Sequence, residues 1–138
     1  MKPKRTILCV DGNEQSLSVR KVMLETRGYR VAAYVSGEEA FERFKMGGVD
    51  LVLADLSASG PEASKLVERM KDASPYTPVI LLSGRMRTYD QETRADVFLS
   101  KNMCAPAELL ERIRILLIRK RGPKRAGGQP PASQAGAA

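Results

Sequence analysis

Five short apolar segments, separated by stretches with helical patterning, constrain the fold of this chain more than any other feature. They are residues 6–10, 29–35, 50–55, 78–84 and 97–100. Each has the length of an ordinary β-strand, and most are apolar throughout, which is typical of strands covered on both faces. Strands that alternate with helices predict an α/β domain with a parallel sheet.

The helical stretches carry recognisable start signals. Asn13 can cap a helix over residues 14–27, and the sequence SGEE at residues 36–39 is a capping box for a second helix. Pro61 and Pro106 each open a further helix. The apolar side of the first helix is predicted to consist of Leu17, Val19, Val22, Met23 and Leu24.

Polar side chains follow four of the predicted strands. Asp11, Asp55, Ser83 and Lys101 each stand at the carboxyl end of a strand, and in an open α/β sheet these ends share one edge. Carboxylate oxygens are ligands that Mg²⁺ prefers, and a carboxylate can also accept a phosphoryl group. A lysine and a hydroxyl can stabilise the charge of that group. One acid at a strand end is usually only solvated, but the four together predict a site.

Composition excludes several classes of function. The chain has no histidine, which rules out histidine-based catalysis and histidine metal sites, and no glycine-rich phosphate loop of the Walker type. Its two cysteines, Cys9 and Cys104, show neither metal spacing nor a disulfide framework, which suits the reducing cytoplasm. No apolar run approaches the length needed to span a bilayer, so we expect a cytoplasmic protein without membrane contact.

The positive charge is concentrated at the end of the chain. The formal net charge is +7, and removing the five basic residues of segment 119–138, which holds no acid, leaves +2 for residues 1–118. The segment is rich in Gly, Pro, Ala and Ser. We therefore expect a domain over residues 1–119 and a disordered tail over 120–138. Nucleic-acid binding is not expected beyond a weak contact through this tail.

The segments ILCVDGNE, DLVLADLSASG, PVILLSG and FLSKN together resemble those of response-regulator receiver domains. The resemblance covers about residues 5–119. It implies a flavodoxin-like, CheY-like fold, with a five-stranded parallel sheet of order 2-1-3-4-5 and helices on both faces.

The resemblance also implies a role for each residue of the site. Asp55 would be the phosphoacceptor, and Lys101 the lysine that pairs with the phosphoryl group. Ser83 would be the hydroxyl that follows the phosphoryl group, and Phe98 the aromatic residue whose rotamer reports it.

The metal site implied by the resemblance is incomplete. Asp11, Asp55 and the backbone carbonyl of Ser57 would hold Mg²⁺, but Gly12 stands where receivers typically carry a second acid. Glu14 is the nearest substitute, although it also suits the first turn of a helix. We therefore expect weak Mg²⁺ binding.

The segment between the fourth and fifth strands departs from the family as well. Residues 85–96 lack the apolar stripe of a helix and are about one turn short. The family's fourth helix is therefore expected to be shortened or absent.

These features predict a single-domain response regulator of a two-component phosphorelay, not an enzyme. It would accept a phosphoryl group on Asp55 from a histidine kinase or phosphotransfer protein and act on a downstream target by protein contact. The alternative is a pseudo-receiver that binds partners without phosphorylation. Gly12 favours this alternative, whereas Asp55, Ser83 and Lys101 favour the first reading. A phosphatase or a flavodoxin is not expected, because the sequence DGNE that follows the first strand suits neither.

Overall fold

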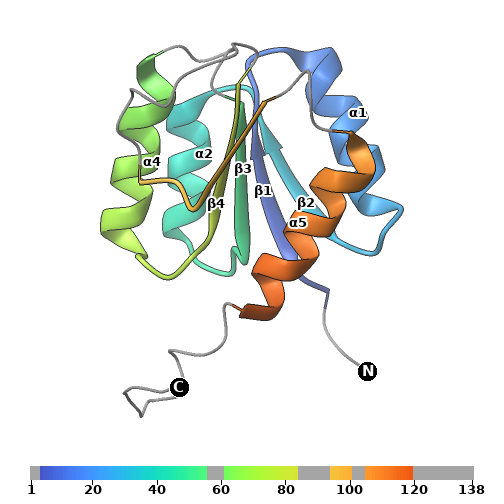
Figure 1. Cartoon of the computed structure of the whole chain (residues 1–138). Coiled ribbons are helices and arrows are strands. Elements are labelled where there is room, and N and C mark those ends of the chain that lie inside the picture. Colours follow the sequence, from blue (N-terminus) through green and yellow to red (C-terminus); the bar gives the residue numbers. More distant parts are fainter. Residues whose placement is uncertain (1–3, 56–60, 84–93, 101–104, 120–138) are drawn as a thin grey trace.

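The computed structural model describes residues 4–55, 61–83, 94–100 and 105–119 (Figure 1). In chain order the elements are β1 (Thr6–Val10), α1 (Glu14–Glu25), β2 (Arg30–Tyr34), α2 (Gly37–Lys45), β3 (Leu51–Asp55), α4 (Pro61–Ala73), β4 (Val79–Ser83), β5 (Val97–Ser100) and α5 (Pro106–Arg119). Each strand falls within a predicted apolar run, and each helix begins where its cap or proline predicted.

The five strands form one parallel sheet in the order β2-β1-β3-β4-β5. The predicted fold class is therefore confirmed. β1 and β3 are neighbours at the centre of the sheet, and their register pairs Val10 with Ala54. The residue that follows each of these, Asp11 or Asp55, therefore stands at the same edge.

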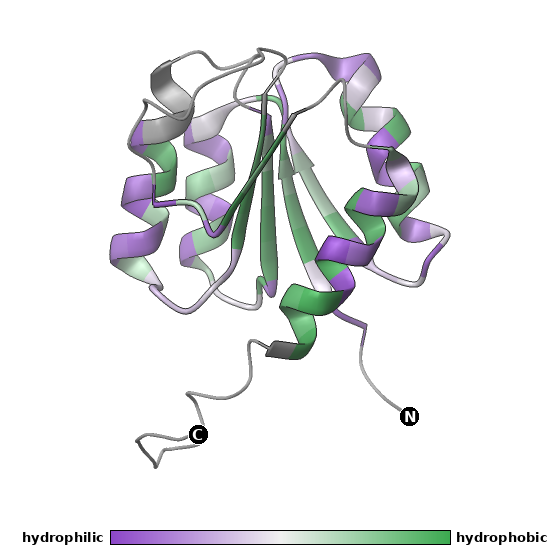
Figure 2. Cartoon of the chain, in the orientation of Figure 1, coloured by the Kyte–Doolittle hydropathy of each residue, from purple (hydrophilic) through white to green (hydrophobic). Residues whose placement is uncertain are grey.

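The two faces of the sheet carry separate hydrophobic cores. α2 and α4 cover one face, and α1 and α5 cover the other (Figure 1). Within each central strand, successive side chains alternate between the two cores, so that Leu8 and Val10 face α2 and α4 while Ile7 and Cys9 face α1 and α5. The strands are accordingly hydrophobic along their length, whereas the helices carry a hydrophilic and a hydrophobic side (Figure 2).

The apolar side of α1 differs from the prediction. Leu17 and Leu24 are buried, but Val19 is 70% exposed and Val22 is 59% exposed. A helix buries positions three, four and seven residues apart, and Arg20 and Lys21 both have this spacing from Leu17 and Leu24. Of the two, Arg20 is the buried one, with 13% of its side chain exposed against 44% for Lys21. An arginine therefore faces the sheet.

A buried lysine links the end of α4 to the residues around the start of β4. Lys71, near the end of α4, lies 2.6 Å from an oxygen of Asp96 and donates a hydrogen bond to the carbonyl of Thr77 at 2.9 Å. The same Asp96 oxygen accepts the amide of Val79 at 2.8 Å. The end of α4, the first residue of β4 and the residue that precedes β5 are thus held together.

The helix expected to be short or absent over residues 85–96, between β4 and β5, falls largely outside the described residues, and residues 94–96, which are described, are not helical. It is a different segment from the helix labelled α4, which precedes β4. The predicted tail, residues 120–138, is also outside them. None of the described helices is long and apolar enough to cross a membrane.

Candidate functional site

Two aspartates meet at the carboxyl edge of the sheet. Asp11 follows the last residue of β1, Asp55 is the last residue of β3, and both side chains are fully buried. Alternation along the strands places them on the same face as Cys9 and Leu53, which is the face that α1 covers. Because a buried carboxylate is costly unless it is paired, both require a partner on this face.

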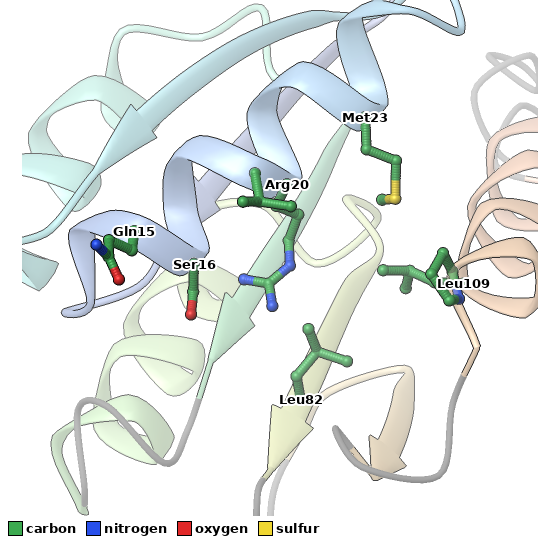
Figure 3. A pocket seen from close by; sticks show the side chains of 8 residues that line it. Gln15, Ser16, Arg20, Met23, Leu82 and Leu109 are labelled. Atoms are coloured by element: carbon green, nitrogen blue, oxygen red, sulfur yellow. The ribbon is translucent and has the colours of Figure 1, made fainter.

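Arg20 supplies positive charge to both aspartates. Its Nη1 atom lies 2.9 Å from Oδ2 of Asp11 and donates a hydrogen bond to it. Its Nη2 atom lies 4.0 Å from Oδ2 of Asp55. The arginine side chain is only 13% exposed and reaches from α1 into the space between that helix and the sheet (Figure 3). The guanidinium is permanently charged, so it offsets the carboxylates at any ordinary pH.

The second oxygen of Asp11 is also engaged. Oδ1 accepts a hydrogen bond from the backbone amide of Asn13 at 2.9 Å. The side chain of Asn13 in turn accepts the amide of Ser16 at 3.0 Å, so that Asn13 caps α1 as predicted. Gly12 lies exposed between them, and Glu14 begins α1 with an exposed side chain.

The described residues do not fit a Mg²⁺ ion as they stand. Within residues 4–55, 61–83, 94–100 and 105–119, no three acidic or cysteine side chains gather, so this part of the site offers two carboxylates, those of Asp11 and Asp55. Mg²⁺ requires close oxygen ligands in octahedral geometry. Both oxygens of Asp11 already accept hydrogen bonds, and one of those bonds comes from a cation. Ser57, whose carbonyl was a predicted ligand, lies outside the described residues.

Of the remaining predicted site residues, the structure describes the positions of Ser83 and Phe98 in their strands. Ser83 is the last residue of β4, one beyond the residue paired with Asp55, so it ends at the same edge of the sheet. Phe98 lies in β5 opposite Leu81 and is partly buried against the core on the α2 and α4 face. Lys101 lies outside the described residues.

An open pocket of about 460 Å³ lies between α1 and α5 (Figure 3). It is lined by Gln15, Ser16, Val19, Arg20, Met23, Leu82, Pro106 and Leu109. Most of this lining is apolar, and Arg20 is the charged side chain among these residues. The same guanidinium therefore borders both the pocket and the acidic pair.

The arginine also influences a neighbouring thiol. Burial raises the pKa of Cys9 to about 12, Arg20 opposes the rise, and Asp11 adds to it. Cys9 is therefore a neutral core residue at physiological pH.

Sequence reasoning found both aspartates and missed Arg20. The available signal was the spacing of Leu17, Arg20 and Leu24, which places a cation on the buried stripe of a helix. Such a cation requires a buried acid, and the sequence had already predicted two acids at the adjoining edge.

Comparison with known proteins identifies the family of the chain. The family described as response regulator receiver domain matches residues 7–114. The chain belongs to this family. Receiver domains are signalling modules that interact with histidine kinases and downstream targets, and they typically bind Mg²⁺ at the phosphorylation site.

Two curated relatives illustrate the similarity. The transcriptional regulatory protein YkoG of Bacillus subtilis is 34% identical over 124 residues, which are 88% of this chain and 54% of YkoG. The response regulator GtcR of Aneurinibacillus migulanus is 30% identical over 119 residues, which are 83% of this chain and 48% of GtcR. The chain thus spans about half the length of these relatives.

Solved structures show the same fold. A CheY-like receiver domain from Methanospirillum hungatei gives a TM-score of 0.77 at 24% identity, covering 86% of this chain and 97% of that one. The receiver domain of an HD domain-containing protein from Pseudomonas fluorescens gives 0.79 at 23% identity, covering 91% and 95% respectively.

Proposed function

We propose that this receiver domain accepts a phosphoryl group on Asp55 from a histidine kinase or phosphotransfer protein and passes the signal on by contact with a downstream protein. The observation that carries the proposal is the position of Asp55. It ends a central strand, beside Asp11 and next to the strand that ends in Ser83. A cytoplasmic location follows from this role, because such donors present their phosphohistidine there.

The proposed transfer uses the carboxylate as a nucleophile. An oxygen of Asp55 attacks phosphorus, the bond between phosphorus and the donor imidazole nitrogen breaks, and that nitrogen keeps the electron pair and takes up a proton. The product is an aspartyl phosphate whose added charge needs positive partners. Arg20, 4.0 Å from Asp55, is one such partner, and we assign the same task to Lys101. Ser83 and Phe98 would then respond to the phosphoryl group, as the family resemblance implies.

A second function is favoured by the ion pair between Arg20 and Asp11 together with the absence of a side chain at Gly12. In this pseudo-receiver, the domain would bind its partner in the state that Arg20 already stabilises. The acidic pair would then be structural, and Asp55 would never be modified.

One experiment separates the two functions. The full chain is incubated with an acyl phosphate donor, with and without Mg²⁺, and its intact mass is measured. Phosphoacceptance predicts an increase of one phosphoryl group that is removed by hydroxylamine and is lost in Asp55→Asn. Labelling of Asp55→Asn to the same extent would refute the assignment of Asp55. An unlabelled natural protein would leave the pseudo-receiver as the better account.

A further inference from the structure

We propose that the guanidinium of Arg20 takes the place of the divalent cation at this receiver site, so that the resting acidic pair is neutralised by the chain itself and Mg²⁺ is excluded. The proposal goes beyond phosphoacceptance, because it concerns the charge balance of the resting protein. It therefore holds whether or not Asp55 is ever modified.

Geometry is the first support. Arg20 donates to Oδ2 of Asp11 at 2.9 Å, and its other terminal nitrogen lies 4.0 Å from Oδ2 of Asp55. A single cation therefore lies against one oxygen of each aspartate, as a bridging metal ion would. An ion bound to Oδ2 of Asp11 at a Mg²⁺ ligand distance of about 2 Å would have to share that oxygen with a guanidinium nitrogen that lies 2.9 Å from it.

Burial is the second support. Both carboxylates are fully buried and the arginine side chain is 13% exposed, so the three groups interact where water screens them poorly. A Mg²⁺ ion could enter only after the arginine left, since two cations against the same oxygen repel each other. The leaving guanidinium would also have to regain its hydration.

The sequence context is the third support. Arg20, which is 13% exposed, falls on the buried stripe of α1 between Leu17 and Leu24, a position that an apolar residue ordinarily takes. Gly12, meanwhile, contributes no carboxylate. The site thus has no carboxylate at position 12 and holds a guanidinium against the two carboxylates it has, and both features weaken the attraction for a metal ion.

The test is a Mg²⁺ titration of the full chain, followed by calorimetry and by the amide shifts of residues 11–13 and 55. Arg20→Leu removes the cation and continues the apolar stripe of α1. We expect this variant to bind Mg²⁺ at least about tenfold more tightly than the natural protein. Lys21→Leu is the matched control, because it removes a positive charge from the next position of the same helix. Lys21 is 44% exposed and pairs with Glu25 at 3.6 Å, so its loss should leave Mg²⁺ affinity unchanged.

Equal Mg²⁺ affinity in the natural protein and Arg20→Leu would overturn the proposal, as would an equal gain in Lys21→Leu.

A second measurement needs no variant. The guanidinium protons of Arg20 should give resolved, slowly exchanging NMR signals that persist in excess Mg²⁺, unlike those of the exposed Arg27. Signals that collapse to those of a free arginine on adding Mg²⁺ would refute the proposal even if Arg20→Leu fails to fold. None of these outcomes depends on phosphorylation, so the two proposals can fail separately.

Discussion

At the level of single residues, the site depends on one arginine that offsets two buried carboxylates. Pairing of this kind is costly to break, because removal of one partner leaves an uncompensated buried charge. A substitution at Gly12 can change the charge of the site without altering Arg20 or the two aspartates. The described glycines with positive φ are Gly28, Gly47 and Gly48. Gly12 is not one of them, so a positive φ does not restrict this position to glycine.

Gly12→Asp should strengthen Mg²⁺ binding, by about tenfold or about 1.4 kcal/mol, because it adds an oxygen ligand and a negative charge beside Asp11. Gly12→Asn is the control, since it adds similar bulk without the charge. Calorimetry on the two variants checks the prediction, and equal affinities would contradict it. Combined with Arg20→Leu, the change should give more than the sum of the two single effects, because both act on the same oxygen atoms.

Cys9 should make stability depend on pH in the alkaline range. Its pKa in the folded protein is raised to about 12 by burial, from an ordinary value of 9.0. Below pH 9 the thiol is protonated in both states, so its contribution is fully present. As pH rises from about 9 to about 12, the unfolded chain loses the proton first, and the free energy of unfolding falls by up to about 1.4 kcal/mol per pH unit.

Denaturant unfolding of the natural protein and of Cys9→Val across this range isolates that thiol from the lysines and tyrosines that titrate in both proteins. The difference between their free energies of unfolding should change with pH. A constant difference would show that Cys9 ionises alike in the folded and unfolded states.

At the level of elements, the described helices and strands agree with their sequence signals because each signal is local. The hydroxyl of Ser36 accepts the amide of Glu39 at 3.3 Å, as the capping box predicted. The failure in α1 has a physical reason. Its apolar residues lie on more than one side, so periodicity alone could not decide that Val19 and Val22 face outward.

The junction of α4 with β4 and β5 should depend on Lys71. Its ammonium group is buried against Asp96 and two carbonyls, those of Pro75 and Thr77. Lys71→Met keeps much of the packing, but it leaves the two carbonyls without this donor and Asp96 without its cation, which should lower the free energy of unfolding by about 2–4 kcal/mol. Arg94→Ala removes an exposed pair with Asp72 and should cost less than about 1 kcal/mol. Equal losses in the two variants, measured by chemical denaturation, would contradict this account.

At the level of the whole molecule, the buried hydrophobic side chains of the described residues all lie between Ile7 and Leu117. They form the two cores on either side of one sheet. Both described cores lie within the domain proposed over residues 1–119.

Removal of residues 120–138 should leave the melting temperature nearly unchanged. That segment is rich in Gly, Pro and Ala and offers almost nothing to bury. The same truncation should reduce any weak, salt-dependent binding to nucleic acid, since the segment carries much of the net positive charge. Thermal unfolding of the truncated and full chains decides the first point, and a large drop would show that the tail packs on the domain.

The sequence by itself determined the parallel sheet, its strand order through the family resemblance, and the edge at which Asp11 and Asp55 meet. These features follow from apolar runs and from the rule that parallel strands end on one side. Only the tertiary structure decided what those acids contact. Arg20 lies nine positions from Asp11 and 35 from Asp55 in the chain, and no local pattern links an arginine on a helix to the ends of two strands. The link appears when α1 packs across the sheet, because burial then forces its one inward-facing cation against the nearest buried anions.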